Sequence, residues 1–229
     1  MVVLGFIGIQ KGKSDNMIFT EPRQKKLLEK VKEYYKVNKP DIAHEFDHTV
    51  RVVYWVIILS KKENADTSIT IPAAMLHDIA IPIVGDEKHA REGAKLCKPL
   101  LEDCGYSKKE IEKIAETISM HSTDDPNPNK TLEGKILFDA DKLDVIGPIG
   151  LHRWFLEYAR KGYMHHKAVK KALSTIAEFK KIYGGNIFFT ETAREIYKEK
   201  SGYAEKICGE ILKDLEKFKD IYKEASLSD

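Results

Sequence analysis

Two imidazoles and two carboxylates in this sequence are candidate ligands for a divalent cation. They are His48, the adjacent pair His77-Asp78, and Asp141. His48 lies 29 residues before His77 and Asp141 lies 63 residues after Asp78, so three separate helices would carry the four side chains. Mixed imidazole and carboxylate ligation suits first-row divalent cations and leaves coordination positions for water and phosphate oxygens. The chemistry that such a set would perform is metal-assisted hydrolysis of a phosphate ester or anhydride.

The residues around these candidates extend the pattern. The segment His44-Glu-Phe-Asp-His48-Thr-Val-Arg51-Val52 reads H-x-x-x-H-x-x-R-V, and residues 131–150 contain the acidic run Asp139-Ala-Asp141-Lys-Leu-Asp144. Together with the ordered signature H…HD…D, these segments resemble the HD-domain phosphohydrolase superfamily, and in particular a small bacterial and archaeal single-domain branch of it. The resemblance covers about residues 40 to 160. It implies an all-α, single-domain HD-type helical bundle with metal ligands His48, His77, Asp78 and Asp141.

Three carboxylates in residues 139–144 are candidates for the last ligand. On a helix, Asp141 and Asp144 share a face, whereas Asp139 is turned by about 200° from Asp141. We therefore expect Asp141 to be the ligand. Asp144 is expected either to support the ligands from behind or to accept a proton, and Lys142 either to pair with a carboxylate or to meet substrate phosphate. The residues expected to take part in catalysis are Asp78, Asp144 and Lys142.

Other polar side chains are expected to contact substrate beside the cation. They are His44, Arg51, His89, His121 and Lys142. His44 lies one helical turn before His48, and Arg51 is suited to bracing a carboxylate or binding phosphate. In some two-metal members of the superfamily, histidines at positions like those of His89 and His121 bind a second cation, whereas other branches bind one. The sequence leaves a second metal open.

One position departs from the superfamily pattern. Several nucleotidases of the superfamily have a glutamate four residues after the HD histidine, and here that position is Ile81. A general acid or base must then come from elsewhere, and the candidates are Asp86, Glu87, Asp144 and Glu45. The departure also supports a second hypothesis, in which the domain is a non-catalytic nucleotide-binding or regulatory module.

A minor alternative is a zinc metalloprotease, because His44-Glu45-Phe-Asp47-His48 also matches H-E-x-x-H. Asp47 would then add a charge that is costly to bury beside the cleft, and no motif marks a third ligand. The favoured function is a metal-dependent phosphohydrolase acting on a phosphomonoester or phosphoanhydride, expected to be a nucleotide. Manganese is the expected cation, and Fe, Co, Ni, Mg or Zn would also fit the ligands.

Apolar spacing predicts the helices that position these residues. After an N-terminal arm at residues 1–20, helices are expected from Pro22 and at about 50–62, 70–81, 88–104, 107–121, 131–146, 148–161, 166–182 and 189–224, the last broken near Gly202. Residues 50–59 are rich in β-branched side chains, but the length of the segment suits a buried helix. Residues 21–229 are predicted to form one bundle, with the metal-binding core at about 40–160 and C-terminal helices at 161–229.

Composition limits the partners. With 38 basic and 36 acidic residues, the net charge of +2 predicts no long-range field that attracts nucleic acid. A small phosphorylated molecule is the expected partner, no membrane segment is expected, and a homodimer is possible. Three cysteines without a C-x-x-C pair argue against disulfides and favour a cytoplasmic protein.

Overall fold

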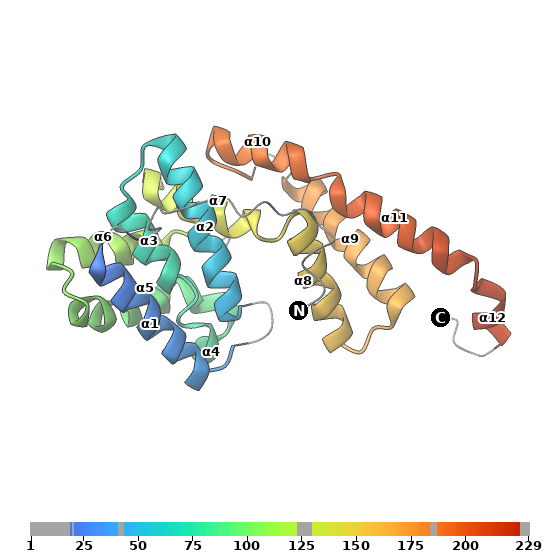
Figure 1. The fold of residues 1–229 in the computed structure, drawn as a ribbon, viewed down its shortest axis with the longest axis horizontal. Coiled ribbons are helices and arrows are strands. Elements are labelled where there is room, and N and C mark those ends of the chain that lie inside the picture. Colours follow the sequence, from blue (N-terminus) through green and yellow to red (C-terminus); the bar gives the residue numbers. More distant parts are fainter. Residues whose placement is uncertain (1–18, 20, 41–43, 123–129, 184–186, 225–229) are drawn as a thin grey trace, which may run out of the picture.

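The computed structural model describes residues 19, 21–40, 44–122, 130–183 and 187–224, and these form helices and no strand (Figure 1). The helices are α1 (Pro22–Val37), α2 (Phe46–Glu63), α3 (Thr67–Leu76), α4 (Ile81–Val84), the 3-10 helix η1 (Asp86–Lys88), α5 (His89–Asp103), α6 (Lys108–Ser119), α7 (Leu132–Leu143), α8 (Gly147–Arg160), α9 (His165–Tyr183), α10 (Glu191–Lys200), α11 (Tyr203–Glu216) and α12 (Lys219–Glu224). The predicted all-α fold is confirmed. The predicted N-terminal arm lies outside the described residues, except for Phe19.

Helix α3 is buried between four other helices. Its residues from Ile69 to Leu76 are all buried, and it packs against α1, α2, α6 and α7. The neighbouring helix α2 buries Val52, Val56 and Leu59, so burial overrides the strand propensity of this segment, as predicted. The window Thr67–Val84 is long and apolar enough by composition to cross a membrane, but 72% of it is buried inside the protein. Its place in the core accounts for its hydrophobicity.

Helix α3 ends earlier than predicted. The helix expected at about 70–81 stops at Leu76, residues 77–80 form turns, and α4 begins at Ile81 with Pro82 in its first turn. Because the ring of Pro82 clashes with the carbonyl four residues earlier and removes an N–H donor, a continuous helix through this segment is disfavoured. His77 and Asp78 therefore lie at the end of a buried helix.

The helices pack around two apolar clusters. The larger cluster joins α1, α2, α3, α5, α6, α7 and α10, whereas Leu151, Tyr158, Val169, Ala172 and Cys208 form a smaller cluster between α8, α9 and α11. In Figure 1, α8, α9 and α11 extend to one side of the larger group. The grouping differs from the predicted division at residue 161, because α8 packs with the C-terminal helices and α10 packs on the larger cluster.

Most predicted helix ends agree with the structure within three residues. Helix α6 starts after the predicted boundary at Ser107, where Ser107 and Glu110 form a reciprocal capping box. The predicted break near Gly202 separates α10 from α11. A second break, between Glu216 and Lys219, was not predicted, and the sequence around it has no proline or glycine that would have indicated it.

Candidate metal centre

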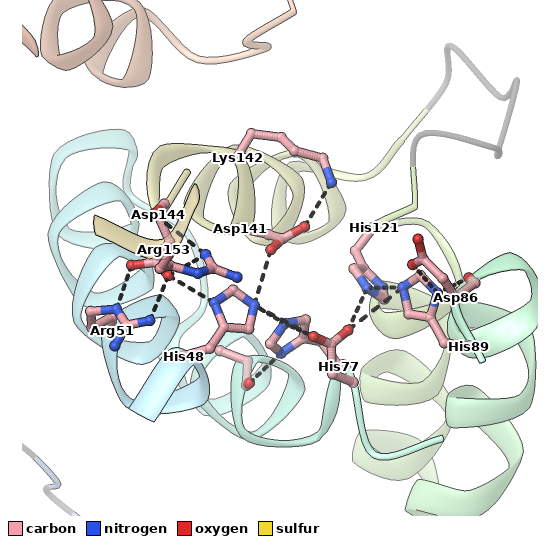
Figure 2. A network of polar contacts seen from close by, with 12 residues as sticks. His48, Arg51, His77, Asp86, His89, His121, Asp141, Lys142, Asp144 and Arg153 are labelled. Carbon is pink, nitrogen blue, oxygen red and sulfur yellow. Dashed lines mark hydrogen bonds and ion pairs between the residues drawn. The ribbon is translucent and has the colours of Figure 1, made fainter. Parts of the chain in front are cut away.

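The four predicted ligands converge from α2, the turn after α3, and α7. Figure 2 shows His48, His77 and Asp141 lying close together. His48 Nε2 lies 3.4 Å from Asp78 Oδ2, 3.3 Å from Asp141 Oδ1 and 3.2 Å from His77 Nε2. His77 Nε2 lies 3.1 Å from the same oxygen of Asp78. Side chains far apart in sequence thus present nitrogen and oxygen atoms to one small volume.

Two further histidines lie on the other side of Asp78. His89 Nε2 is 3.6 Å and His121 Nε2 is 3.5 Å from Asp78 Oδ1, and the two nitrogens are 2.9 Å apart. The groups His48, His77, Asp78 and Asp78, His89, His121 are all buried, and each could hold a metal ion. One carboxylate is therefore shared by two ligand groups, with one oxygen facing each.

The other nitrogen of each imidazole is already bonded. The Nδ1 atoms of His77 and His121 donate to the carbonyls of Ala74 and Ile118, at 2.8 and 2.6 Å, and His89 Nδ1 donates to the carbonyl of Asp86. With Nδ1 donating, the Nε2 atom of a neutral imidazole carries a lone pair. Two lone pairs that face each other at 2.9 or 3.2 Å repel unless a proton or a cation lies between them. The donor set therefore fits bound cations.

The protonation states agree with this arrangement. Burial acts to lower the pKa of His48, but hydrogen bonds to Asp141, Asp144 and Asp78 outweigh it and raise the pKa to about 10. Burial acts to raise the pKa of Asp78, yet the nearby imidazoles hold it well below its usual range. Without a cation, the centre thus keeps its carboxylate ionised and binds a proton on His48. A cation that binds there would displace that proton.

Asp144 holds His48 from behind. Its Oδ2 accepts from His48 Nδ1 at 2.8 Å, and Arg51 donates to both of its oxygens, from Nε at 2.8 Å and from Nη2 at 3.1 Å. Burial acts to raise the pKa of Asp144, but the bonds from His48 and Arg51 lower it. Of the two predicted roles, these contacts favour support of a ligand over proton acceptance. Arg51 likewise braces a carboxylate, which was one of its two predicted roles.

Arg153 of α8 was missed by sequence reasoning. Its Nη1 donates to Asp144 Oδ2 at 2.6 Å, so it joins the same cluster. Nothing in the residue type or spacing of Arg153 marked it, because its contact depends on how α8 turns back toward α7. Figure 2 shows Arg51 and Arg153 on the same side of His48.

The remaining predicted site residues lie around the rim. Lys142 Nζ donates to Asp141 Oδ2 at 2.8 Å, so the predicted pairing with a carboxylate is present. The ring of His44 is half-buried and lies 6.1 Å from the ring of His48, measured between centroids. Asp139 points away from the centre, as predicted, and accepts from the backbone N–H groups of Phe189 and Thr190 at 2.9 and 2.8 Å. Contact of His44 and Lys142 with substrate stays a prediction.

Of the other alternative acids, Asp86 lies at the edge of the centre and Glu45 lies at the start of α2. Ile81 is buried, and the carboxylate of Asp86 is 80% exposed although it lies 3.5 Å from His89 Nδ1. Glu45 is the exposed N-cap of α2, so His44 precedes that helix. The arrangement of the H-E-x-x-H match therefore differs from that of a zinc protease, in which both histidines lie on one helix with the glutamate between them.

Comparisons with known proteins agree with the geometry. A family model for the HD domain matches residues 46–146. YpgQ of Bacillus subtilis is 28% identical over 179 residues, which cover 76% of this chain and 85% of YpgQ. A solved structure of a predicted HD superfamily hydrolase from an uncultured Thermotogales bacterium is 27% identical, with a TM-score of 0.60, 85% of this chain covered and 94% of that one. The structure of B. subtilis YpgQ in complex with ADP has a TM-score of 0.64 at 24% identity, covering 84% of this chain and 94% of that chain. The matched segment contains both histidine groups and their shared aspartate, so the part of this chain that is similar to the HD domain is the part that carries the candidate metal centre.

Proposed function

We propose that this protein is a hydrolase that uses divalent cations to cleave the phosphate bonds of a nucleotide. The observation that carries the proposal is the position of Asp78, whose two carboxylate oxygens each face a separate pair of buried imidazole nitrogens. Divalent cations held there would lower the pKa of water, polarise a phosphoryl oxygen and stabilise the charge that develops in phosphoryl transfer. The relatives described as HD superfamily hydrolases support the same class of reaction.

The ligands divide between two cations. His48, His77, Asp78 and Asp141 would hold one, and His89 and His121 would hold the other together with Asp78. We propose Mn²⁺ as the cation, because a mixed set of imidazole and carboxylate ligands suits it; Fe²⁺, Co²⁺, Ni²⁺, Mg²⁺ and Zn²⁺ are the alternatives. The two imidazole pairs make the second cation, which the sequence had left open, part of the proposal.

Substrate would reach the centre beside Asp141 and Lys142. Their side chains are 14% and 20% exposed, whereas the side chains of His48, His77 and Asp78 are at most 4% exposed. The ammonium group of Lys142 lies at this rim and would offset the negative charge of an incoming phosphate. His44 is close enough to His48 to contact a second phosphate.

The three carboxyls of the centre offer no proton to a leaving group, and this favours a phosphoanhydride over a phosphomonoester. The pKa values of Asp78 and Asp141 are held well below the ordinary range against the effect of burial, and that of Asp144 is also lowered. None of these carboxyls would therefore donate a proton to a leaving oxygen. A leaving phosphate or pyrophosphate departs without a proton, whereas an alkoxide needs a general acid. We therefore propose a nucleoside diphosphate or triphosphate, and the structure of YpgQ with ADP supports a nucleotide.

We also propose that the protein acts in the cytoplasm. Its three cysteines are free thiols and all are buried. Free thiols persist in reducing compartments, where disulfides are rare. The cytoplasm would supply nucleotides as substrates.

The test is an assay for released phosphate and pyrophosphate. The protein would be stripped of metal with a chelator, reloaded with Mn²⁺, and incubated with nucleoside mono-, di- and triphosphates. We expect turnover of a di- or triphosphate, loss of turnover in Asp78→Asn, and full turnover in Glu112→Gln, which changes an exposed carboxylate on α6.

Four outcomes would contradict the proposal. Turnover that survives Asp78→Asn would show that the centre is not responsible. Turnover of monophosphates alone would contradict the proposed leaving group. Tight nucleotide binding with no turnover for any cation would favour the non-catalytic module, and cleavage of casein would favour a protease.

A further inference from the structure

The four imidazoles of the centre are not held in the same way. His77, His89 and His121 each donate Nδ1 to the carbonyl of the residue three positions earlier, so their own local backbone orients them. His48 instead donates Nδ1 to Asp144, 96 residues away on another helix. The orientation of His48 therefore depends on whatever holds Asp144.

Asp144 is held by two guanidinium groups from different helices. Arg51 lies on α2, the helix that also carries His48, and donates hydrogen bonds to both carboxylate oxygens of Asp144. Arg153 lies on α8 and donates Nη1 to Oδ2, the oxygen that His48 uses, and to the backbone carbonyl of Asp144 at 3.4 Å. Arg153 thus fixes both the carboxylate and the end of α7. Charge-assisted bonds of this kind are short and directional.

Two glycines allow Arg153 to reach Asp144. Gly147 starts α8 with φ of +69°, a conformation that other residues rarely adopt. Gly150 lies so close to the turn before α8 that a Cβ atom there would come within 2.2 Å of the carbonyl carbon and oxygen of Val145. Arg153 follows Gly150 by three residues and shares its helix face, so the close approach at Gly150 directs Arg153 toward Asp144.

We infer that Arg153 is a positioning residue for the metal ligand His48, acting through Asp144 from outside the segment that matches the HD domain. That match ends at residue 146, before α8 begins. Helix α8 packs on α9 and α11 in the smaller apolar cluster. Arg153 is therefore a contact through which the C-terminal helices act on the metal centre. The inference rests on the proposed function in one respect, that His48 binds a cation.

The first experiment measures cation affinity in the full-length protein. Metal-stripped protein is titrated with Mn²⁺ while free Mn²⁺ is followed by electron paramagnetic resonance. Because residues that orient a metal ligand typically contribute ten- to hundredfold in affinity, we expect Arg153→Ala to weaken one binding step by that factor and to leave the step at His89 and His121 within about threefold. Arg153→Lys, which restores one charged donor, should recover part of the loss.

A matched control lies on the same helix. Arg160 pairs with Glu157 and its side chain is 53% exposed, so Arg160→Ala removes an arginine from α8 without touching Asp144. Affinity for Mn²⁺ should be unchanged in this variant. Gly150→Ala, which pushes α8 away from Val145, should weaken the same binding step as Arg153→Ala.

The second experiment needs no metal. In the metal-free protein labelled with ¹⁵N, the Nδ1 protons of His48, His77 and His121 are hydrogen-bonded and should be visible by NMR. Arg153→Ala should speed solvent exchange of the His48 proton and leave those of His77 and His121 unchanged. If wild type binds no Mn²⁺, the proposed function fails while this measurement still decides the positioning of His48.

The inference is overturned if Arg153→Ala leaves both the Mn²⁺ affinity and the His48 proton unchanged. It is also overturned if all histidine protons and both binding steps change equally, because Arg153 would then only stabilise the fold. If Arg153→Ala does not fold, Arg153→Lys decides alone: a selective change at His48 supports the inference, and no change or a uniform one rejects it.

Discussion

The shared carboxylate of Asp78 leads to a prediction about metal-dependent stability. Both of its oxygens lie within 3.6 Å of imidazole nitrogens, one on each ligand group. Asp78→Asn keeps the shape of the side chain but removes its charge and places an NH₂ group toward one of the two sites. This single substitution should therefore abolish the stabilisation that both cations provide.

The size of the effect follows from mass action. A cation present at 100 times its dissociation constant stabilises the native state by about 2.7 kcal/mol, so two independent sites contribute about 5.4 kcal/mol. For a chain of this length, each kcal/mol raises Tm by about 2–4 °C. Wild type should thus gain about 11–22 °C on loading. His121→Ala, which removes a ligand from one group only, should gain about half of that, and Asp78→Asn close to none.

Differential scanning calorimetry with and without Mn²⁺ would test this expectation. Each variant is compared with its own chelated form, so any change in the metal-free stability cancels. Glu112→Gln is the matched control and should gain as much as wild type. The reasoning is refuted if Asp78→Asn keeps more than half of the wild-type gain, or if His121→Ala gains as much as wild type.

Three other predictions concern the fold. Ile114 of α6 is fully buried, so Ile114→Ala should destabilise the protein by about 2–4 kcal/mol in urea unfolding, and a loss below about 1 kcal/mol would contradict its place in the core. Burial raises the pKa of Cys97 to about 12, so a thiol reagent at pH 8 should label it only as fast as the chain opens, which mass spectrometry would follow. The bond from Arg23 lowers the pKa of Glu110 from 4.5 to about 2. Because the Arg23–Glu110 pair is partly exposed, it contributes about 1 kcal/mol to the free energy of unfolding. This stabilisation is present above pH 4.5 and is lost as the pH falls toward 2, so the Tm deficit of Glu110→Gln should shrink over that range.

The sequence was sufficient to predict features that depend on local patterns. Apolar periodicity located the helices, and the length of the segment around Val56 identified α2 as a helix in spite of its β-branched residues. The helical repeat also separated Asp139 from Asp141 and Asp144 correctly.

Features that depend on tertiary geometry were not predictable. The contact of Arg153 with Asp144 requires a left-handed backbone conformation at Gly147 and a close backbone approach at Gly150. The residue type of Arg153 indicates neither of these features. The grouping of α8 with the C-terminal helices likewise depends on which apolar faces meet. The spacing of residues along the sequence predicts neither the contact of Arg153 nor the grouping of α8.

Helix α7 explains why the acidic residues of the closing motif cannot replace one another. Asp139 binds the N-terminus of α10, Asp141 faces His48 Nε2, and Asp144 binds His48 Nδ1. A rotation of about 100° per residue turns Asp139 away from His48 and brings Asp141 and Asp144 to different nitrogens of its ring, so each carboxylate has a different role. Loss of Asp139 should loosen α10 and leave the cation sites intact, whereas loss of Asp141 should weaken cation binding and leave α10 in place. Asp144 connects the metal centre with the C-terminal helices, because it orients the ligand His48 and is itself held by Arg153 of α8, outside the HD-domain match.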